Sequence, residues 1–243
     1  MRPFLVALQF LTSLPVQLAV PPDEREIGHS LAWYPVVGLL LGGVVFLAAL
    51  ILDSAPPLLG AALLLVLWVL LSGGLHLDGL ADSADAWIGG LGDRDRTLAI
   101  MKDPRCGPAG VVAVVLLLLL KFSAIYSLLE SGVPIPLLLA PVLGRMALPL
   151  LFLTTPYLRR EGLGSALATH ASPKRVVLIS VAVLMVLLVV EKSSLFWLMI
   201  VAVVLFVVLR TMMMRRLGGT TGDLAGALVE LTETAVLTAA VLV

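Results

Sequence analysis

Seven long apolar blocks divide the sequence and restrict what this chain can fold into. They cover residues 35–52, 57–71, 111–129, 135–153, 176–190, 195–209 and 224–243. Several approach the ~20 residues that a helix needs to cross the hydrocarbon core of a bilayer. Backbone polar groups cannot stay unpaired in lipid, so blocks of this kind must form helices. The pattern predicts an all-α, polytopic membrane helix bundle with about seven spans.

The composition excludes an ordinary soluble domain. Of the 243 residues, 60% are hydrophobic and only 13% are charged, against about 25% charged residues in a typical soluble domain. The net charge is zero and no nucleic-acid-binding module is visible, so we expect a lipid bilayer and no nucleic acid among the partners. Cys106 is the only cysteine, which excludes an internal disulfide framework and a thiolate metal cluster. The sequence leaves a homo-oligomer open.

The N-terminus resembles a secretory signal peptide only superficially. Arg2 precedes an apolar run that reaches Leu14, but the run is short, Pro15 interrupts it and no clear small-x-small cleavage site follows. We predict that residues 4–14 form a retained helix that lies in the membrane interface or dips into the membrane. No internal repeat or low-complexity linker is apparent, so residues 1–243 are expected to form a single integral membrane domain.

The basic residues are concentrated on one side of the predicted membrane. If the spans alternate in direction, the N-terminus and loops 72–110, 154–175 and 210–223 share a side. Thirteen basic residues lie there, namely Arg2, Arg25, Arg94, Arg96, Lys102, Arg105, Arg159, Arg160, Lys174, Arg175, Arg210, Arg215 and Arg216. The opposite loops carry only Lys192. Because cytoplasmic loops carry the excess of Lys and Arg, the polar loops that hold the motifs are predicted to be cytoplasmic.

Three aspartates follow the second apolar block at helical spacing. Asp78, Asp82 and Asp85 stand at positions i, i+4 and i+7, so on a helix they project from one face. Stacked carboxylates repel one another unless a cation or a basic partner offsets their charge. Hard oxygen ligands of this kind suit Mg²⁺, which combines one or two carboxylates with substrate phosphate oxygens. The alternative is a solvated helix face at the membrane surface.

Gly73, Gly74 and His76 precede this carboxylate face. The two glycines would allow a tight turn or a close approach of the backbone to a substrate. His76 lies on the other side of the same helix, where a structural role is as consistent with the sequence as a catalytic one.

A mixed-charge segment around residue 103 forms a second candidate. Lys102 and Arg105 are natural partners for phosphate oxygens, and Asp103 could add a metal ligand. An ordinary surface loop is the alternative. Further along the chain, the basic loop 159–164 is another candidate for anion contact, and its Arg160 and Glu161 are candidate substrate-binding residues.

Several charged residues fall inside or beside the later apolar blocks. Arg145 lies within block 135–153, where a charge is costly and indicates function by default; a buried ion pair is the alternative. Glycines and hydroxyls precede the last block and could form an anion cradle at a helix N-terminus. The residues concerned are Gly218, Gly219, Thr221 and Asp223, although Asp223 could instead be a helix N-cap. Glu230 and Glu233 lie deeper in that block, and we predict that they border the same cavity as the aspartates, with an ion pair to Arg145 as the alternative.

Four polar motifs together resemble the cobalamin synthase family, also called the adenosylcobinamide-GDP ribazoletransferases. They are GGLHLDGLADSADA (73–86), LAIMKDPRCGPAG (98–110), REGLG (160–164) and LGGTTGDLAGALVELTE (217–233). FLTSLPV (10–16) and YPVVGLLLG (34–42) resemble the family's opening motifs. The likeness therefore covers nearly the whole chain.

The resemblance implies a Mg²⁺-dependent transferase of cobalamin biosynthesis in the cytoplasmic (inner) membrane. Such an enzyme would transfer the adenosylcobinamide-phosphate part of adenosylcobinamide-GDP to α-ribazole or its 5′-phosphate and release GMP. The aspartate face would hold Mg²⁺, while Lys102 and Arg105 would stabilise charge on the phosphates. A carboxylate such as Asp82, or His76, would accept the proton of the attacking ribose hydroxyl.

Two other classes of membrane protein share some of these features. A CDP-alcohol-type membrane phosphotransferase also groups aspartates on helices, but the second aspartate pair expected there is missing. A secondary transporter could use the buried charges as a coupling path, but transporters often contain repeated halves, and none is found here.

Overall fold

The computed structural model describes residues 1–191 and 195–242, and nearly all of their regular structure is helical. In chain order the elements are α1 (Arg2–Leu11), α2 (Glu24–Ser30), the 3₁₀ turn η1 (Leu31–Trp33), α3 (Tyr34–Ile51), α4 (Pro57–Ser72), α5 (Leu75–Gly89), α6 (Arg94–Ile100), α7 (Pro108–Glu130), α8 (Pro136–Thr154), α9 (Leu163–His170), α10 (Pro173–Val190), α11 (Leu195–Leu217) and α12 (Gly222–Leu242). No β-strand forms within the described residues, where Tyr157 and Thr220 make an isolated bridge.

Among the residues that the structure describes, six helical segments are long and apolar enough to cross a membrane, which confirms the predicted polytopic bundle. They are Glu24–Ile51, α7, α8, α10, α11 and α12. The predicted span 57–71 corresponds to α4, which meets α5 at a bend of 88°. The pair makes a seventh span only if both helices count as one broken crossing. Taken alone, α5, which carries the three aspartates, is not among the six segments.

Two glycines produce the sharp turn between α4 and α5. Gly73 and Gly74 have φ values of 65° and 70°, a left-handed conformation that is costly for residues with a side chain. The segment after α1 supports this turn, because the Ser13 backbone N–H donates to the Leu71 carbonyl at 2.8 Å and the Ser13 hydroxyl donates to the Leu70 carbonyl at 2.5 Å. Of the two roles predicted for the glycines, the structure assigns the tight turn.

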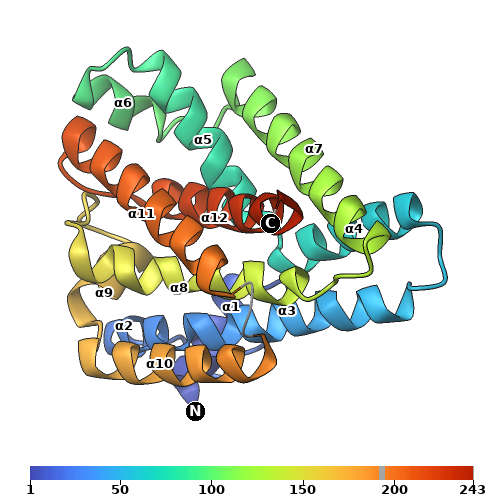
Figure 1. Cartoon of the computed structure of the whole chain (residues 1–243). Coiled ribbons are helices and arrows are strands. Elements are labelled where there is room, and N and C mark those ends of the chain that lie inside the picture. The colour runs from blue at the N-terminus through green and yellow to red at the C-terminus, as the bar shows by residue number, and fades with distance from the viewer. Residues whose placement is uncertain (192–194, 243) are drawn as a thin grey trace.

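Helices α8 and α12 form the centre of the bundle (Figure 1). α3 packs along α8, while α12 packs against α5, α7, α8 and α11. Both central helices are mostly buried, whereas α10 and α11 leave most of their apolar side chains exposed. An apolar outer surface of this kind is suited to lipid, because lipid, unlike water, does not penalise its exposure.

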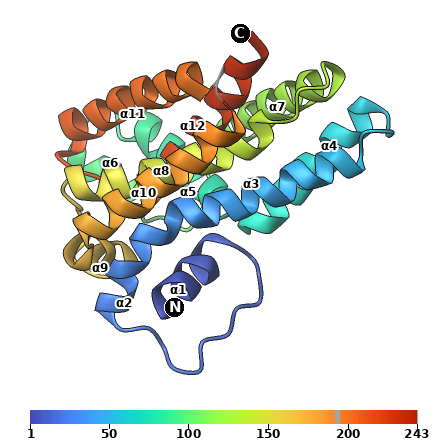
Figure 2. The same ribbon diagram turned by 60° about the horizontal axis from the view of Figure 1, so that its bottom comes forward.

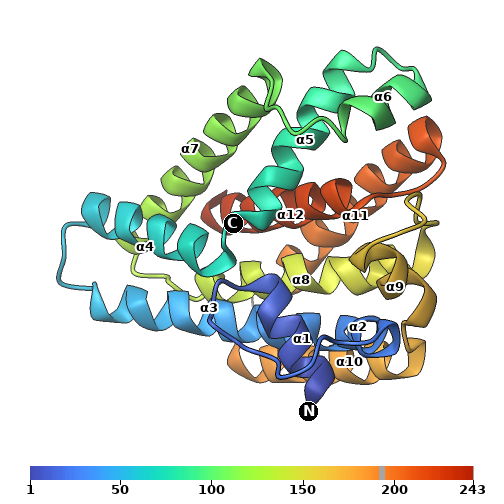
Figure 3. The same cartoon turned by 180° about the vertical axis from the view of Figure 1, so that it is seen from behind.

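The N-terminal segment forms a helix, as predicted, although it ends earlier than residue 14. α1 ends at Leu11 and buries Val6, Ala7 and Leu11 against the neighbouring helices. Figures 2 and 3 show α1 beside α2 and α3. The burial of these side chains against the bundle explains why α1 has an apolar face. Its position relative to the lipid interface stays a prediction.

The polar connections gather at one end of the bundle. In Figure 1, α2, α6, α9 and the junction of α11 with α12 lie on the left, whereas the α3–α4 and α7–α8 connections lie on the right. The view from behind in Figure 3 gives the same division. The bundle therefore brings loops 72–110, 154–175 and 210–223 together, as the alternating spans require.

Candidate active site

The aspartate face of α5 lies beside the first turn of α12. Gly79 allows this approach, since a Cβ at that position would lie 2.8 Å from the backbone oxygen of Asp223. Partial burial, followed by the charges of Asp78, Asp223 and Asp85, raises the pKa of Asp82 to about 6. Excess negative charge is thus concentrated around Asp82. The structure thereby places Asp223, from a distant part of the chain, with the aspartates of α5.

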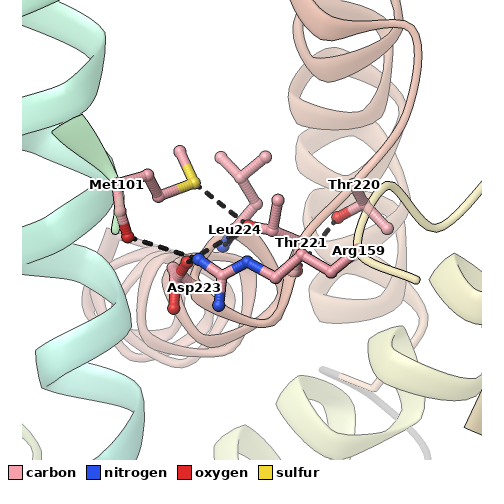
Figure 4. Close-up of polar contacts among 6 residues, drawn as sticks. All are labelled: Met101, Arg159, Thr220, Thr221, Asp223 and Leu224. Carbon is pink, nitrogen blue, oxygen red and sulfur yellow. Dashed lines mark hydrogen bonds and ion pairs between the residues drawn. The ribbon is translucent and has the colours of Figure 1, made fainter. Parts of the chain in front are cut away.

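Arg159 connects this acidic group to the loop after α8 (Figure 4). Its guanidinium forms an ion pair with the Asp223 carboxylate and donates to the Met101 carbonyl at 3.2 Å. Thr221 caps α12, because its hydroxyl accepts from the Leu224 backbone N–H at 3.3 Å. Asp223 is therefore not the N-cap. Thr221 is fully buried in this capping role, and its contact with substrate stays a prediction.

A cavity of about 140 Å³ lies between α1, α3, α5, α8 and α12. Its lining includes Phe10, Tyr34, His76, Asp78 and Asp223. The rings of Phe10 and Tyr34 are stacked, with centroids 6.3 Å apart. This cavity, called the aromatic cavity below, thus combines an aromatic wall with two carboxylates and an imidazole.

His76 is held neutral inside this cavity. Burial lowers its pKa well below the usual value, and the positive charges of Arg145 and Lys121 lower it further. Its Nδ1 atom has no hydrogen-bond partner among the described residues. A neutral imidazole with a free ring nitrogen can accept a hydrogen bond from a ligand hydroxyl.

A second pocket, the basic pocket, adjoins Arg159 and has a volume of about 430 Å³. It is lined by Leu98, Lys102, Leu158, Arg159, Arg160 and Glu161. Arg159 therefore belongs to this pocket while its ion-pair partner Asp223 belongs to the aromatic cavity. No feature of the sequence distinguishes Arg159 from Arg160. Only the packing of the loop against α12 separates their roles.

The Asp85 carboxylate, a predicted metal ligand, contacts the backbone at the start of α7. Its carboxylate accepts hydrogen bonds from the backbone N–H groups of Gly107 at 2.6 Å and Gly110 at 2.8 Å. A Cβ on either glycine would come within 2.5 Å of a carboxylate oxygen. Asp85 satisfies free N–H groups at the start of α7, as a carboxylate at a helix N-terminus does.

Asp103 and Arg105, predicted to bind metal and phosphate, pair with each other. They form an ion pair of 2.7 Å, in which the Arg105 side chain is 87% exposed. Hydrogen bonds from Arg105 lower the pKa of Asp103 to about 2. The two charges thus neutralise each other at the surface. Lys102 differs, because it lines the basic pocket.

Glu230 and Glu233, predicted to border the cavity of the aspartates, are not among the residues that line it. Glu233 forms ion pairs with Arg145 and with Lys121, the latter at 2.6 Å, and Lys121 also binds Glu230 at 2.9 Å. All four side chains are buried. They form an ion-pair network between α7, α8 and α12, which is the alternative that the sequence analysis left open, with Lys121 as an additional partner.

Gly218 and Gly219 form a packed turn and not an open anion cradle. The Thr220 backbone N–H donates to the Pro156 carbonyl at 2.8 Å, and the Leu158 N–H donates to the Thr220 carbonyl at 2.9 Å. Gly218 has a φ of 75°, and a Cβ on Gly219 would collide with the Pro156 carbonyl. These glycines hold the loop after α8 against α12, which positions Arg159.

Comparison with known proteins gives a consistent result over the full length. The family described as cobalamin-5-phosphate synthase matches residues 3–241. A Pseudomonas paraeruginosa protein named adenosylcobinamide-GDP ribazoletransferase is 59% identical over 239 residues, which cover 98% of this chain and 97% of that protein. A Stutzerimonas stutzeri protein of the same name is 56% identical over 237 residues, covering 98% and 96% of the two chains. No solved structure matches this chain.

Proposed function

Because the chain belongs to the cobalamin-5-phosphate synthase family and has adenosylcobinamide-GDP ribazoletransferase activity, we propose that its active site is the junction where Arg159 pairs with Asp223. The reaction moves adenosylcobinamide phosphate from adenosylcobinamide-GDP to α-ribazole or its 5′-phosphate and releases GMP. One observation carries this assignment. A pocket lined by cations adjoins a cavity lined by carboxylates, and a single ion pair belongs to both.

The basic pocket suits the diphosphate of the donor. Phosphoryl transfer depends mainly on positioning and on neutralising phosphate charge. The side chains of Lys102 and Arg160 have no ion-pair partner among the described residues, so both are free to bind phosphate oxygens. Arg159 would direct the reacting phosphate towards the aspartates.

Asp78 and Asp82 are the residues that would hold Mg²⁺. Burial raises the pKa of Asp82, and the negative charges of Asp78, Asp223 and Asp85 raise it further; a divalent cation would offset those charges. In the described part of the chain, no three His, Cys, Asp or Glu side chains converge on one metal position. This accords with an ion held by one or two carboxylates and completed by phosphate oxygens and water. When bound, it would neutralise charge on the diphosphate.

The aromatic cavity suits the acceptor. Phe10 and Tyr34 offer flat apolar surfaces to an aromatic base, while His76 and Asp78 offer acceptors to a ribose hydroxyl. In the proposed step, the hydroxyl donates to His76 Nδ1, its oxygen forms a bond to phosphorus, and the bond to the GMP oxygen breaks. A cavity of about 140 Å³ admits only part of the reactants, so the corrinoid must lie outside it.

The orientation is proposed from charge. The loops that form the site carry most of the basic residues outside the spans, and such loops remain cytoplasmic. We therefore assign the enzyme to the cytoplasmic membrane, with its active site on the cytoplasmic side.

The activity assay uses the purified full chain in detergent or lipid vesicles. Adenosylcobinamide-GDP and Mg²⁺ are supplied with α-ribazole or with α-ribazole 5′-phosphate, and the cobamide and GMP are measured by chromatography. We expect equal amounts of both products, and none when Mg²⁺ is removed with EDTA. GMP formed without any acceptor would indicate hydrolysis and contradict the assignment.

A further inference from the structure

The basic pocket contains one side chain that a phosphate site does not explain. Glu161 lines it together with Lys102, Arg159 and Arg160. A carboxylate repels phosphate oxygens, so its presence weakens a site that only neutralises a diphosphate. Glu161 forms no ion pair with Lys102 or Arg160 in the described residues. Its acceptor oxygens are therefore free.

Two further features indicate what the pocket accommodates. Leu98 and Leu158 contribute apolar surface beside the charged groups, which suits the face of a planar ring. The volume of about 430 Å³ falls in the usual range of roughly 300–1,000 Å³ for small-molecule sites. The pocket thus offers apolar walls for a ring, free cations for phosphates and one free carboxylate.

We propose that Glu161 selects the guanine base of the donor nucleotide. This inference rests on the proposed function, because it places the GDP portion of the donor in the basic pocket. A carboxylate only accepts hydrogen bonds. The Watson–Crick edge of guanine presents two adjacent donors, its N1–H and its N2 amino group. The same edge of adenine presents the unprotonated N1 atom, which repels a carboxylate.

The arrangement divides recognition of the nucleotide among three groups. Glu161 binds the base edge, Leu98 and Leu158 contact the ring, and Lys102 with Arg160 bind the phosphates. Arg159 then lies where the diphosphate meets the aromatic cavity, since its guanidinium already pairs with Asp223. Selectivity for the base is therefore separate from the groups proposed to act on the reacting phosphate.

The test measures equilibrium binding of GDP and ADP to the purified full chain, without corrinoid or acceptor. Wild type is expected to bind GDP at least ~10-fold more tightly than ADP, because a missing or reversed hydrogen bond at a specific site costs at least this factor. Glu161→Gln should weaken GDP binding and remove most of the difference. Lys102→Met is the matched control, which should weaken both nucleotides to the same extent.

Two outcomes would overturn the proposal. One is a wild-type protein that binds GDP and ADP equally. The other is a Glu161→Gln variant that binds both more tightly by the same factor, as expected if Glu161 only repels phosphate. Glu161 is exposed, so the substitution should leave the thermal midpoint unchanged. Because this assay needs no turnover, loss of transferase activity would count against the proposed function and leave the base preference separately testable.

Discussion

At the scale of single residues, Asp82 differs from the other aspartates of α5. It lies near Asp78, Asp85 and Asp223, with Arg159 as the compensating positive charge. Asp85, by contrast, is engaged with backbone N–H groups. The function of the acidic face should therefore depend mainly on Asp82.

Replacing Asp82 with Asn should abolish most of the activity and leave the fold intact. The change keeps the size of the side chain and removes the charge at a site where groups act electrostatically. We expect turnover to fall by at least ~10²-fold, the lower range for a positioned electrostatic group, with an unchanged thermal midpoint. Asp95→Asn is the matched control, because Asp95 is 90% exposed and pairs only with neighbouring Arg94. Near-normal turnover of the Asp82→Asn variant would indicate that the aspartate face of α5 is only a solvated surface.

The pH dependence of Mg²⁺ activation follows from the same residue. The pKa of Asp82 is raised to about 6, so its charge is lost as the pH falls through this value. Mg²⁺ requires the deprotonated carboxylate, and the charged fraction falls from nearly all at pH 7.5 to about a quarter at pH 5.5. The Mg²⁺ concentration for half-maximal rate should rise about fourfold over this interval. A value that stays constant in initial-rate titrations would contradict this role.

At the scale of helices, the apolar blocks predicted the long spans, and Gly73 with Gly74 predicted the turn after α4. Both features depend on residues that are close together in the sequence, so they can be predicted without knowledge of the tertiary structure. α2, α6 and α9 were missed because these helices are only 7, 7 and 8 residues long. The partners of Asp85 lie 22 and 25 residues away, and Lys121, the partner of Glu233 in α7, lies 112 residues away. Such pairings depend on helix packing, which one sequence does not reveal.

The junction between α5 and α7 gives a prediction about stability. Asp85→Ala removes two hydrogen bonds to a charged acceptor and leaves the N–H groups of Gly107 and Gly110 without it. Hydrogen bonds of this type contribute about 1.5–3 kcal/mol each, so the thermal midpoint should fall by several degrees. The Mg²⁺ dependence of the remaining activity should stay as in wild type. A changed Mg²⁺ requirement with normal stability would restore Asp85 as a metal ligand.

At the scale of the whole molecule, the buried ion-pair network connects α7, α8 and α12. Glu233→Gln leaves Lys121 and Arg145 with one carboxylate between them. Breaking a buried ion pair typically costs about 3–5 kcal/mol, so the variant should unfold at a clearly lower temperature. In a double variant with Arg145→Met and Glu233→Leu, Lys121 keeps Glu230, and much of the loss should be recovered. A double variant less stable than the single one would contradict a structural role.

The orientation of the bundle can be tested by thiol labelling. In a Cys106→Ala background, Arg96→Cys and Lys174→Cys should react with impermeant reagents only after the cells are permeabilised. Ser54→Cys, in the opposite connection, should react in intact cells. All three positions are exposed. Labelling of Arg96→Cys and Lys174→Cys from outside would reverse the proposed orientation.

The buried network also has a consequence for how this sequence can diverge. Its two cations and two carboxylates sum to zero charge inside an otherwise apolar core. A substitution that neutralised one of these four side chains would leave an uncompensated charge in the core. A second substitution in the network would be needed to restore a net charge of zero. Lys121, Arg145, Glu230 and Glu233 should therefore covary as a charge-neutral set among homologous sequences, whereas Asp82 should stay fixed whatever happens to them.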